Sequence, residues 1–221
     1  MRLSEKAYDH VKTLLLAGQV KADEWLPIET IAEELGASRQ PVMDAMKRLK
    51  LEGFIDIVPQ VGCRVRSPSI QEIDDFFRLF AAGEALIAEL AASRAEREDI
   101  LSLQLISAQI GALAENGADN KSQGENYRIL NRRLHAEMRR ISRSPLLTDV
   151  VESLGDRSDF YVALSTEPVF GLNIEQAHQE HQAIIEAIAN ASPQEARAAM
   201  EKHIFATENR VLNKLETRGQ A

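Results

Sequence analysis

Three histidines share one feature, because each lies within an apolar helical stripe where a polar ring is unusual. They are His135, His181 and His203, and Asn131 lies one turn before the first of them. A single buried histidine is usually a core residue with satisfied hydrogen bonds, whereas three on three separate helices point to a shared ligand. Imidazole nitrogens suit divalent ions such as Zn, Ni or Mn, and a helical bundle core is a natural place for them to converge. The sequence therefore predicts a divalent metal site.

Arg157 is a second polar residue in an apolar setting, because it interrupts a helical stripe that includes Leu154 and Tyr161. A buried arginine requires a partner. Glu84, on the stripe of an earlier helix, could form a structural ion pair with it. Alternatively, the guanidinium could bind a ligand carboxylate, whose geometry it matches. The sequence leaves both interpretations open.

Helices would position all of these residues. A first long helix is expected to begin at Ser69, and five more are expected at roughly 98–115, 122–142, 145–165, 174–190 and 193–216. Six helices without strand signals predict an all-α bundle. The first of them has apolar residues on two sides, which favours a bundle on one face and a partner subunit on the other.

The N-terminal part has a different pattern, consisting of three helices and a hairpin. The segment "FIDIVPQVGCRVR" alternates apolar and polar residues on both sides of "PQVG", as a two-stranded hairpin does. Serine and proline in residues 65–69 then mark a linker. We therefore expect two domains, 1–67 and 68–221.

The third helix has features typical of DNA recognition. Ser38 is a suitable N-cap, which places Pro41 in the first turn, where its missing N–H costs nothing. A short helix, a tight turn and a second helix with polar N-terminal residues form a helix-turn-helix, whose second helix enters the major groove. The residues expected to face DNA lie on this helix and on the hairpin, which would be a wing. They are Ser38, Arg39, Gln40, Met43, Lys47, Arg48, Gln60, Gly62 and Arg64.

The net charge of −8 at first argues against nucleic acid. Residues 1–67, however, contain ten basic and ten acidic side chains, so the excess of acid lies entirely in residues 68–221. A neutral module with a local basic surface can bind DNA while attached to an acidic body.

Other bulk properties narrow the class of protein. The 221 residues are 44% hydrophobic, and no apolar run reaches membrane-spanning length. No signal-peptide pattern is evident at the N-terminus, and the single cysteine, Cys63, excludes an intramolecular disulfide or a thiolate cluster. We expect a cytoplasmic protein that does not contact membranes.

The segment "LPIETIAEELGASRQPVMDAMKRLKLEGFIDIVPQVGCRV" resembles the winged helix of GntR-family transcriptional regulators, across nearly all of residues 5–66. The shared motif is "LAxxLGxSRxPVxxAxxxLxxEGxI", followed by the wing glycine Gly62. The resemblance implies a homodimer that binds a near-palindromic double-stranded DNA operator. The family often carries arginine where this chain has Glu29 or Thr30, and again at Met43, which implies an unusual operator.

The pattern "NRRLH…QEHQAIIEAI…ARAAMEKHI" is similar to the FCD (FadR C-terminal) effector domain, over roughly residues 70–215. Metal-binding members use positions that here hold Asn131, His135, His181 and His203. Asn131 in place of aspartate leaves the ligand set uncharged, which would attract an anionic effector, such as a small carboxylate-bearing metabolite. The candidate effector contacts are Arg157, Phe80, Tyr127 and Glu84.

Together these features predict a mainly α protein, with an N-terminal winged helix-turn-helix and a C-terminal FCD-like six-helix bundle. It would act as a ligand-responsive transcriptional regulator, a repressor rather than an enzyme. One alternative is a metal-dependent hydrolase, because a histidine-bound ion with an open position can activate water. Neither Glu180 nor Glu137 is a compelling general base for it. A second alternative is an interaction module with a degenerate DNA domain, which Glu29 and Met43 favour.

Overall fold

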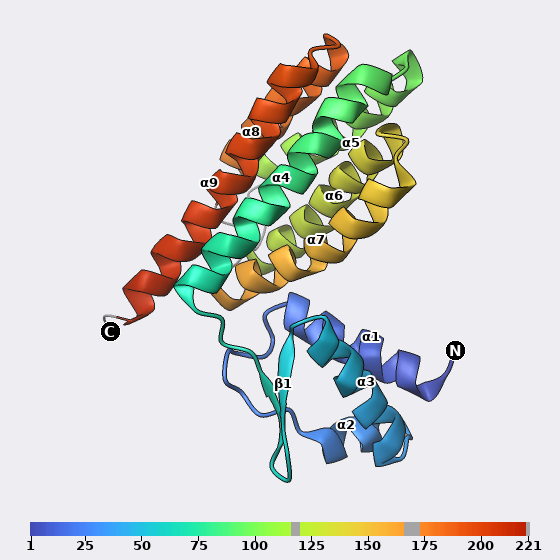
Figure 1. Ribbon diagram of the computed structural model, residues 1–221, viewed down its shortest axis with the longest axis vertical. Coiled ribbons are helices and arrows are strands. Elements are labelled where there is room, and N and C mark those ends of the chain that lie inside the picture. The colour runs from blue at the N-terminus through green and yellow to red at the C-terminus, as the bar shows by residue number, and fades with distance from the viewer. Residues whose placement is uncertain (116–119, 166–172, 220–221) are drawn as a thin grey trace. The chain divides into compact units, whose positions relative to one another are not determined.

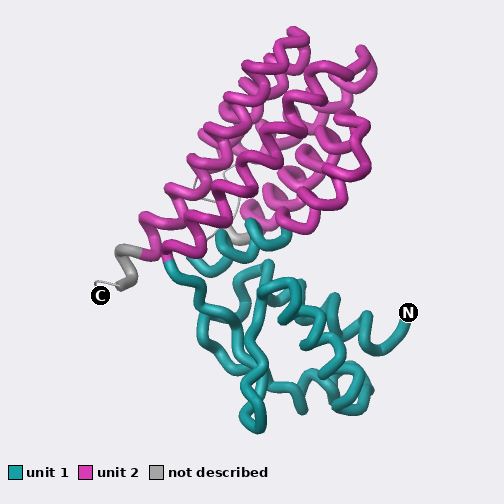
Figure 2. The backbone as a smooth tube through the Cα atoms, viewed as in Figure 1, with its two compact units in different colours: residues 1–69, 156–167 teal, residues 70–155, 168–221 magenta. Residues whose placement is uncertain are grey.

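The computed structural model describes residues 1–115, 120–165 and 173–219 (Figure 1). Contacts divide the chain into two compact units, coloured separately in Figure 2. Unit 1 comprises Met1–Ser69 with Asp156–Glu167, and unit 2 comprises Ile70–Gly155 with Pro168–Ala221. The helix that spans Pro145–Ser165 therefore contributes its first half to unit 2 and its second half to unit 1.

Unit 1 contains three short helices and a hairpin. The elements are α1 (Leu3–Leu16), α2 (Ile28–Glu34), α3 (Arg39–Leu51), β1 (Ile55–Val58) and β2 (Gly62–Val65). The buried residues of α3 are Val42, Ala45, Met46 and Leu49, which recur at helical spacing, and α3 packs on α1. These four residues form the inward face of the helix.

Gly53 ends α3 with φ +82°, in the left-handed region that glycine adopts without strain. A Cβ atom at this position would overlap the guanidinium of Arg157, from the part of α7 (Pro145–Ser165) that belongs to unit 1. Phe160 of the same segment packs edge-on against Phe54, with ring centroids 5.2 Å apart. Unit 1 therefore includes a short stretch of α7 as part of its core.

The hairpin is antiparallel, with Asp56 opposite Arg64 and Val58 opposite Gly62. Its tip needs a left-handed residue, which Gln60 supplies with φ +62°. Cys63 and Val65 are buried, whereas Gly62 and Arg64 alternate with them on the outer face. The hairpin predicted around "PQVG" is thus present, with the arginine on its solvent side.

Unit 2, in its described residues, is a bundle of six helices. Besides the first half of α7, it contains α4 (Ile70–Arg94), α5 (Arg97–Glu115), α6 (Asn120–Ile141), α8 (Ile174–Ala189) and α9 (Pro193–Gly219). In Figure 1, α4 runs alongside α9, and it also packs on α6 and α8. The mainly α class, with a winged helix followed by a helical bundle, is confirmed.

The expected second apolar side of α4 is partly open in the single chain. Leu79 is 61% exposed, and Gly83 and Leu86 are half-buried, whereas Phe76 is covered. No helix in the described ranges is both long and apolar enough to span a membrane.

Candidate nucleic-acid interface and metal centre

The recognition helix α3 presents a polar face to solvent. Ser38 is its N-cap residue, and Arg39, Gln40, Lys47 and Arg48 are all exposed at the surface of unit 1. A tight turn with Gly36 at φ +58° joins α2 to this helix. Met43, expected on the same face, is half-buried. The arrangement presents polar side chains at the end of the helix that would enter a major groove.

Three of the exposed basic side chains of α3 form ion pairs with carboxylates. The ion pairs are Arg39 Nη1–Glu29 Oε1 at 2.7 Å, Lys47 Nζ–Asp44 Oδ1 at 2.9 Å and Arg48 Nε–Glu52 Oε1 at 3.0 Å. Glu29 occupies a position where the family often has arginine. It also forms an ion pair with Arg39, an arginine that this chain retains. The sequence pattern placed Glu29 on α2 but did not reveal this pairing.

The wing carries the other expected DNA contacts. Gln60 lies exposed at the tip, and Gly62 and Arg64 follow on the outer face of β2. Asp23 Oδ1 lies 3.4 Å from Arg64 Nη1, at the long end of an ion pair. The wing arginine is therefore only loosely neutralised.

In unit 2, the three predicted histidines converge. His135 comes from α6, His181 from α8 and His203 from α9, and all three are buried. One nitrogen from each ring lies within 4.8 Å of the others, and the Nε2 atoms of His181 and His203 are 3.2 Å apart. Two nitrogens bound to one tetrahedral ion would be about 3.3 Å apart, given metal–nitrogen bonds of about 2.0–2.1 Å. These two rings are therefore already at ligand spacing.

Carboxylates orient two of the three rings. Glu84 Oε2 on α4 lies 3.1 Å from His135 Nδ1, and Glu180 Oε2 on α8 lies 2.8 Å from His203 Nδ1. A carboxylate accepts the Nδ1–H and so leaves the Nε2 lone pair available, which is the arrangement that holds histidine ligands around metal ions. His181 has no such partner for its Nδ1 in the part of the chain that the structure describes.

Arginines neutralise both carboxylates. Arg139 Nη1 donates to Glu84 Oε1 at 3.1 Å, and Arg210 Nη1 donates to Glu180 Oε1 at 3.2 Å. Burial alone would raise the pKa of Glu84, but His135 and Arg139 outweigh it and hold that pKa below its ordinary value. For Glu180 as well, burial is the largest influence, but its histidine and arginine partners outweigh it and lower the pKa. Both carboxylates are therefore ionised.

Two of the imidazoles, those of His181 and His203, are in contrast held neutral. Burial lowers the pKa of His181 well below its ordinary value, and the neighbouring His203 and His135 add to the effect. Burial also lowers the pKa of His203, although Glu180 opposes it. Neutral imidazole is the form that binds metal ions.

Asn131 supplies a fourth potential ligand. Its Oδ1 atom is buried and has no hydrogen-bond partner among the described residues, and it lies one turn before His135 on α6. An orphaned buried oxygen is costly unless something binds it. The three imidazole nitrogens therefore fit a divalent ion, and the amide oxygen of Asn131 is the candidate for a fourth ligand.

The predicted effector contacts are dispersed. Phe80 is buried and stacks on Phe76, with centroids 5.7 Å apart, and Tyr127 is buried on α6. The expected ion pair between Glu84 and Arg157 is wrong, because the Glu84 carboxylate binds His135 and Arg139 instead. Arg157 packs on Gly53 within unit 1, where its Nε atom has no hydrogen-bond partner among the described residues.

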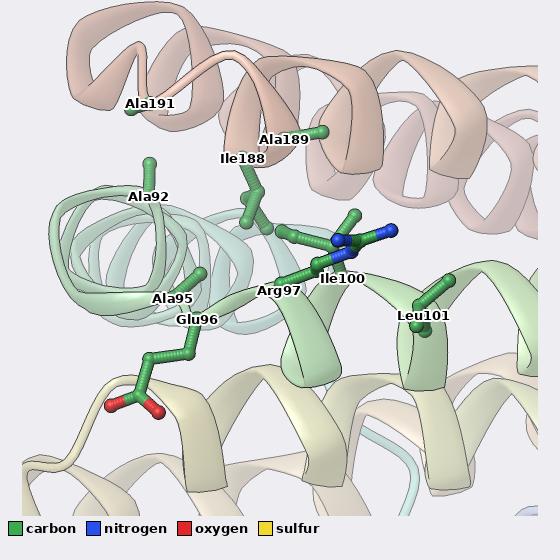
Figure 3. Close-up of a pocket in the computed structure, with 9 residues that line it drawn as sticks. All are labelled: Ala92, Ala95, Glu96, Arg97, Ile100, Leu101, Ile188, Ala189 and Ala191. Carbon is green, nitrogen blue, oxygen red and sulfur yellow. The ribbon is translucent and has the colours of Figure 1, made fainter.

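A shallow pocket of about 330 Å³ lies elsewhere on unit 2 (Figure 3). Its lining comes mainly from alanine and isoleucine side chains at the end of α4, the start of α5 and the end of α8, with Glu96 and Arg97 among them. It includes none of the residues predicted from the sequence.

A winged helix-turn-helix followed by a helical bundle with a buried histidine cluster is typical of a DNA-binding regulator with a separate helical unit. Residues 3–65 match the family model described as bacterial regulatory proteins of the gntR family, and residues 75–206, more than half of the chain, match the FCD domain. The chain therefore belongs to the FCD group of GntR-family bacterial transcriptional regulators.

Curated relatives are transcriptional regulators. YdhC of Bacillus subtilis, an uncharacterised regulator of the helix-turn-helix type, is 23% identical over 199 residues, which cover 90% of this chain and 84% of YdhC. The Escherichia coli repressor GlaR is 25% identical over 208 residues, covering 90% of each chain.

Solved structures share the fold. The structure of McbR/YncC from E. coli has a TM-score of 0.80 at 19% identity, covering 97% of this chain and 99% of that one. A GntR-type regulator from Rhodococcus sp. RHA1 has a TM-score of 0.74 at 12% identity, with 95% and 97% covered.

Proposed function

We propose that this GntR-type regulator is a homodimeric repressor that reads a two-fold symmetric operator with α3 and the wing of each protomer. The observation that carries the proposal is the exposed polar N-terminal end of α3, at Ser38, Arg39 and Gln40. The partly open apolar side of α4 at Leu79 supports a second copy, and the name of GlaR as a repressor supports the sign of regulation. Two-fold symmetry of the protein would then be mirrored in the operator.

We further propose that Asn131, His135, His181 and His203 bind one divalent ion, with Zn, Ni or Mn as candidates. The 3.2 Å separation of two Nε2 atoms carries this proposal, together with the carboxylates that fix two of the rings. When bound, the ion would supply a Lewis-acid position for an anionic group. Glu84 would orient a ligand rather than contact an effector.

The effector would be a small carboxylate-bearing metabolite that binds beside this site. Phe80 lies one turn before Glu84 on α4, and Tyr127 lies one turn before Asn131 on α6. On these two helices they are the buried aromatic side chains nearest in sequence to the residues of the proposed metal site. Arg157 is omitted from this site because its guanidinium packs on Gly53. Effector binding would shift operator affinity by about 1–3 kcal/mol, the usual size of such couplings.

A hydrolytic role has less support. Glu180 already binds His203 and Arg210, and Glu137 forms an ion pair with Arg140 at 2.8 Å. Neither carboxylate is thus available to activate water. The curated relatives above are also named as regulators rather than enzymes.

Selection from a random duplex pool with folded, metal-loaded protein tests the regulator. We expect recovery of a two-fold symmetric site whose affinity falls steeply as salt rises. Recovery of no preferred sequence would contradict operator recognition. The same protein, stripped with a chelator, would then be titrated with Zn, Ni and Mn, and the absence of binding by any of them would contradict the metal site.

A further inference from the structure

The chain segment before α2 pairs with the wing through an isolated antiparallel bridge between Trp25 and Arg64. Leu26 N–H donates to Cys63 at 2.9 Å, and Val65 N–H donates to Glu24 at 2.9 Å, so Trp25 lies directly opposite Arg64. On the other side, β1 places Asp56 opposite the same arginine. Arg64 is therefore the middle residue of a row of three, with Asp56 opposite it in the hairpin and Trp25 opposite it in the bridge.

Trp25 packs against the outer face of this row. Its ring lies 5.8 Å from the Arg64 guanidinium carbon, and its Cε3 atom would be 3.4 Å from a Cβ atom at Gly62. A guanidinium within about 6 Å of an indole face is attracted to it. The indole therefore also lies over Gly62, at ordinary van der Waals distance from where a side chain would begin.

Among the residues that the structure describes, the Arg64 guanidinium has one weak ion-pair partner. Asp23 contacts one terminal nitrogen at 3.4 Å, and Nε is buried without a hydrogen-bond partner in the described part of the chain. Trp25 is nonetheless 47% exposed, which is unusual for the largest side chain in a small unit. Indole and guanidinium thus form one exposed surface that is both apolar and cationic.

We propose that Trp25 is a positioning residue of the nucleic-acid interface, which holds the Arg64 guanidinium for a backbone phosphate and presents its own exposed edge to the adjacent sugar. This inference rests on the proposed operator recognition. Phosphate is the fitting acceptor because it takes the free donors of a planar guanidinium and displaces the weak contact with Asp23. Apolar and cationic groups side by side are also typical of proteins that contact the sugar-phosphate edges of a groove.

Trp25 is the only tryptophan in the sequence, so the intrinsic tryptophan fluorescence reports on this site alone. We expect the tryptophan emission to change when a selected duplex is added, with a titration midpoint equal to that from the anisotropy of a labelled duplex. Arg64→Ala should reduce the slope of log affinity against log salt by about one. Trp25→Ala should reduce it similarly and weaken binding by about three- to tenfold at moderate salt.

A double-mutant cycle separates positioning from folding. If the indole acts through the arginine, Trp25→Ala in the Arg64→Ala background should have little further effect, and Trp25→Phe should restore most of the salt slope. Leu51→Ala, at an apolar side chain of unit 1 that is 88% exposed and lies off the wing, is the matched control and should bind as the wild type does. Circular dichroism at the assay temperature confirms that each variant is folded.

Three results would overturn the inference while leaving operator recognition intact. One is a wild-type protein that binds the duplex by anisotropy without any change in tryptophan emission. The second is a Trp25→Ala variant with an unchanged salt slope. The third is additive loss in the Trp25/Arg64 cycle, which would make the indole a packing residue only. Failure of the wild type to bind any duplex would instead remove the proposed function itself.

Discussion

Glu84 provides a sharp test of the histidine cluster, because it binds a proposed ligand and a buried cation at once. In Glu84→Gln, the amide can rotate and donate to His135 Nδ1, which would favour the tautomer with a proton on Nε2 and block that ligand atom. Changes to carboxylates that orient metal-bound histidines typically cost about 10–100-fold in metal affinity. We expect a loss of that size for Zn, Ni or Mn in this variant.

Stability and metal affinity need to be separated in this experiment. Glu84→Gln leaves Arg139, whose side chain is only 10% exposed, without its carboxylate, and breaking a buried pair costs about 3–5 kcal/mol. Glu180→Gln disturbs His203 in the same way, but Arg210 is 24% exposed and can recruit water. The second variant should therefore lose comparable metal affinity with a smaller loss of unfolding free energy.

Competition with a chromogenic chelator at a temperature where each variant is folded measures the affinity, and urea unfolding without metal measures stability. Glu89→Gln is the control, because Glu89 lies on the same helix and binds Arg197 at 2.8 Å near the surface. Wild-type affinity in both Glu84→Gln and Glu180→Gln would refute the reasoning. An equal loss in Glu89→Gln would also refute it, since the effect would then reflect bundle stability alone.

Other parts of the chain give three further predictions. Glu29→Gln should release Arg39 and raise affinity for a selected duplex by up to about fivefold by anisotropy, since exposed ion pairs are worth about 0.2–1 kcal/mol; an unchanged affinity would contradict this. Burial and the adjacent Asp74 raise the pKa of Glu208 to about 7, so the folded state binds its proton more tightly and stability falls as pH rises from about 5 through 7. Glu208→Gln should remove that slope in urea unfolding and stabilise the protein at pH 8 by about 1–2 kcal/mol, whereas an unaltered pH profile would assign the slope elsewhere. Gly53→Ala should destabilise by about 1–3 kcal/mol, because φ is +82° and the added Cβ meets a guanidinium; an unchanged melting temperature would contradict it.

Helical periodicity explains why the histidine cluster could be predicted. In a regular helix, residues three or four apart share a face, so His181 within an apolar stripe had to point into a core. The same rule correctly placed Val42 and Leu49 on the buried side of α3. The three rings converge if the helices that bear them pack together. In a six-helix bundle each helix has few other helices to pack against, so this packing is expected.

Pairing between side chains of different elements was not predictable in the same way. Whether Glu84 reaches Arg139 or Arg157 depends on the relative rotation of helices, about which spacing within one helix carries no information. The sequence pattern placed Arg157 in an interrupted apolar stripe, but the second half of α7 belongs to unit 1, which no periodicity reveals. Trp25 likewise precedes α2 in a segment without regular spacing, so its position opposite Arg64 follows only from the strand pairing.

Two similar networks of hydrogen-bonded side chains surround the histidine cluster, and they link metal binding to the stability of the bundle. In each network a histidine donates to a glutamate that an arginine neutralises: His135 with Glu84 and Arg139, and His203 with Glu180 and Arg210. An imidazole that ligates a dication becomes a stronger Nδ1–H donor, so each bond to glutamate tightens when the Nε2 atom is occupied. The two networks and the cluster together include residues of α4, α6, α8 and α9, and occupancy would therefore stiffen four of the six helices at once. If an ion binds as proposed, a free metal concentration of 100 times the dissociation constant would stabilise the folded bundle by about 2.7 kcal/mol. Slower amide hydrogen exchange at those four helices, without change at α1 and α2, is the pattern that such a cross-link would produce.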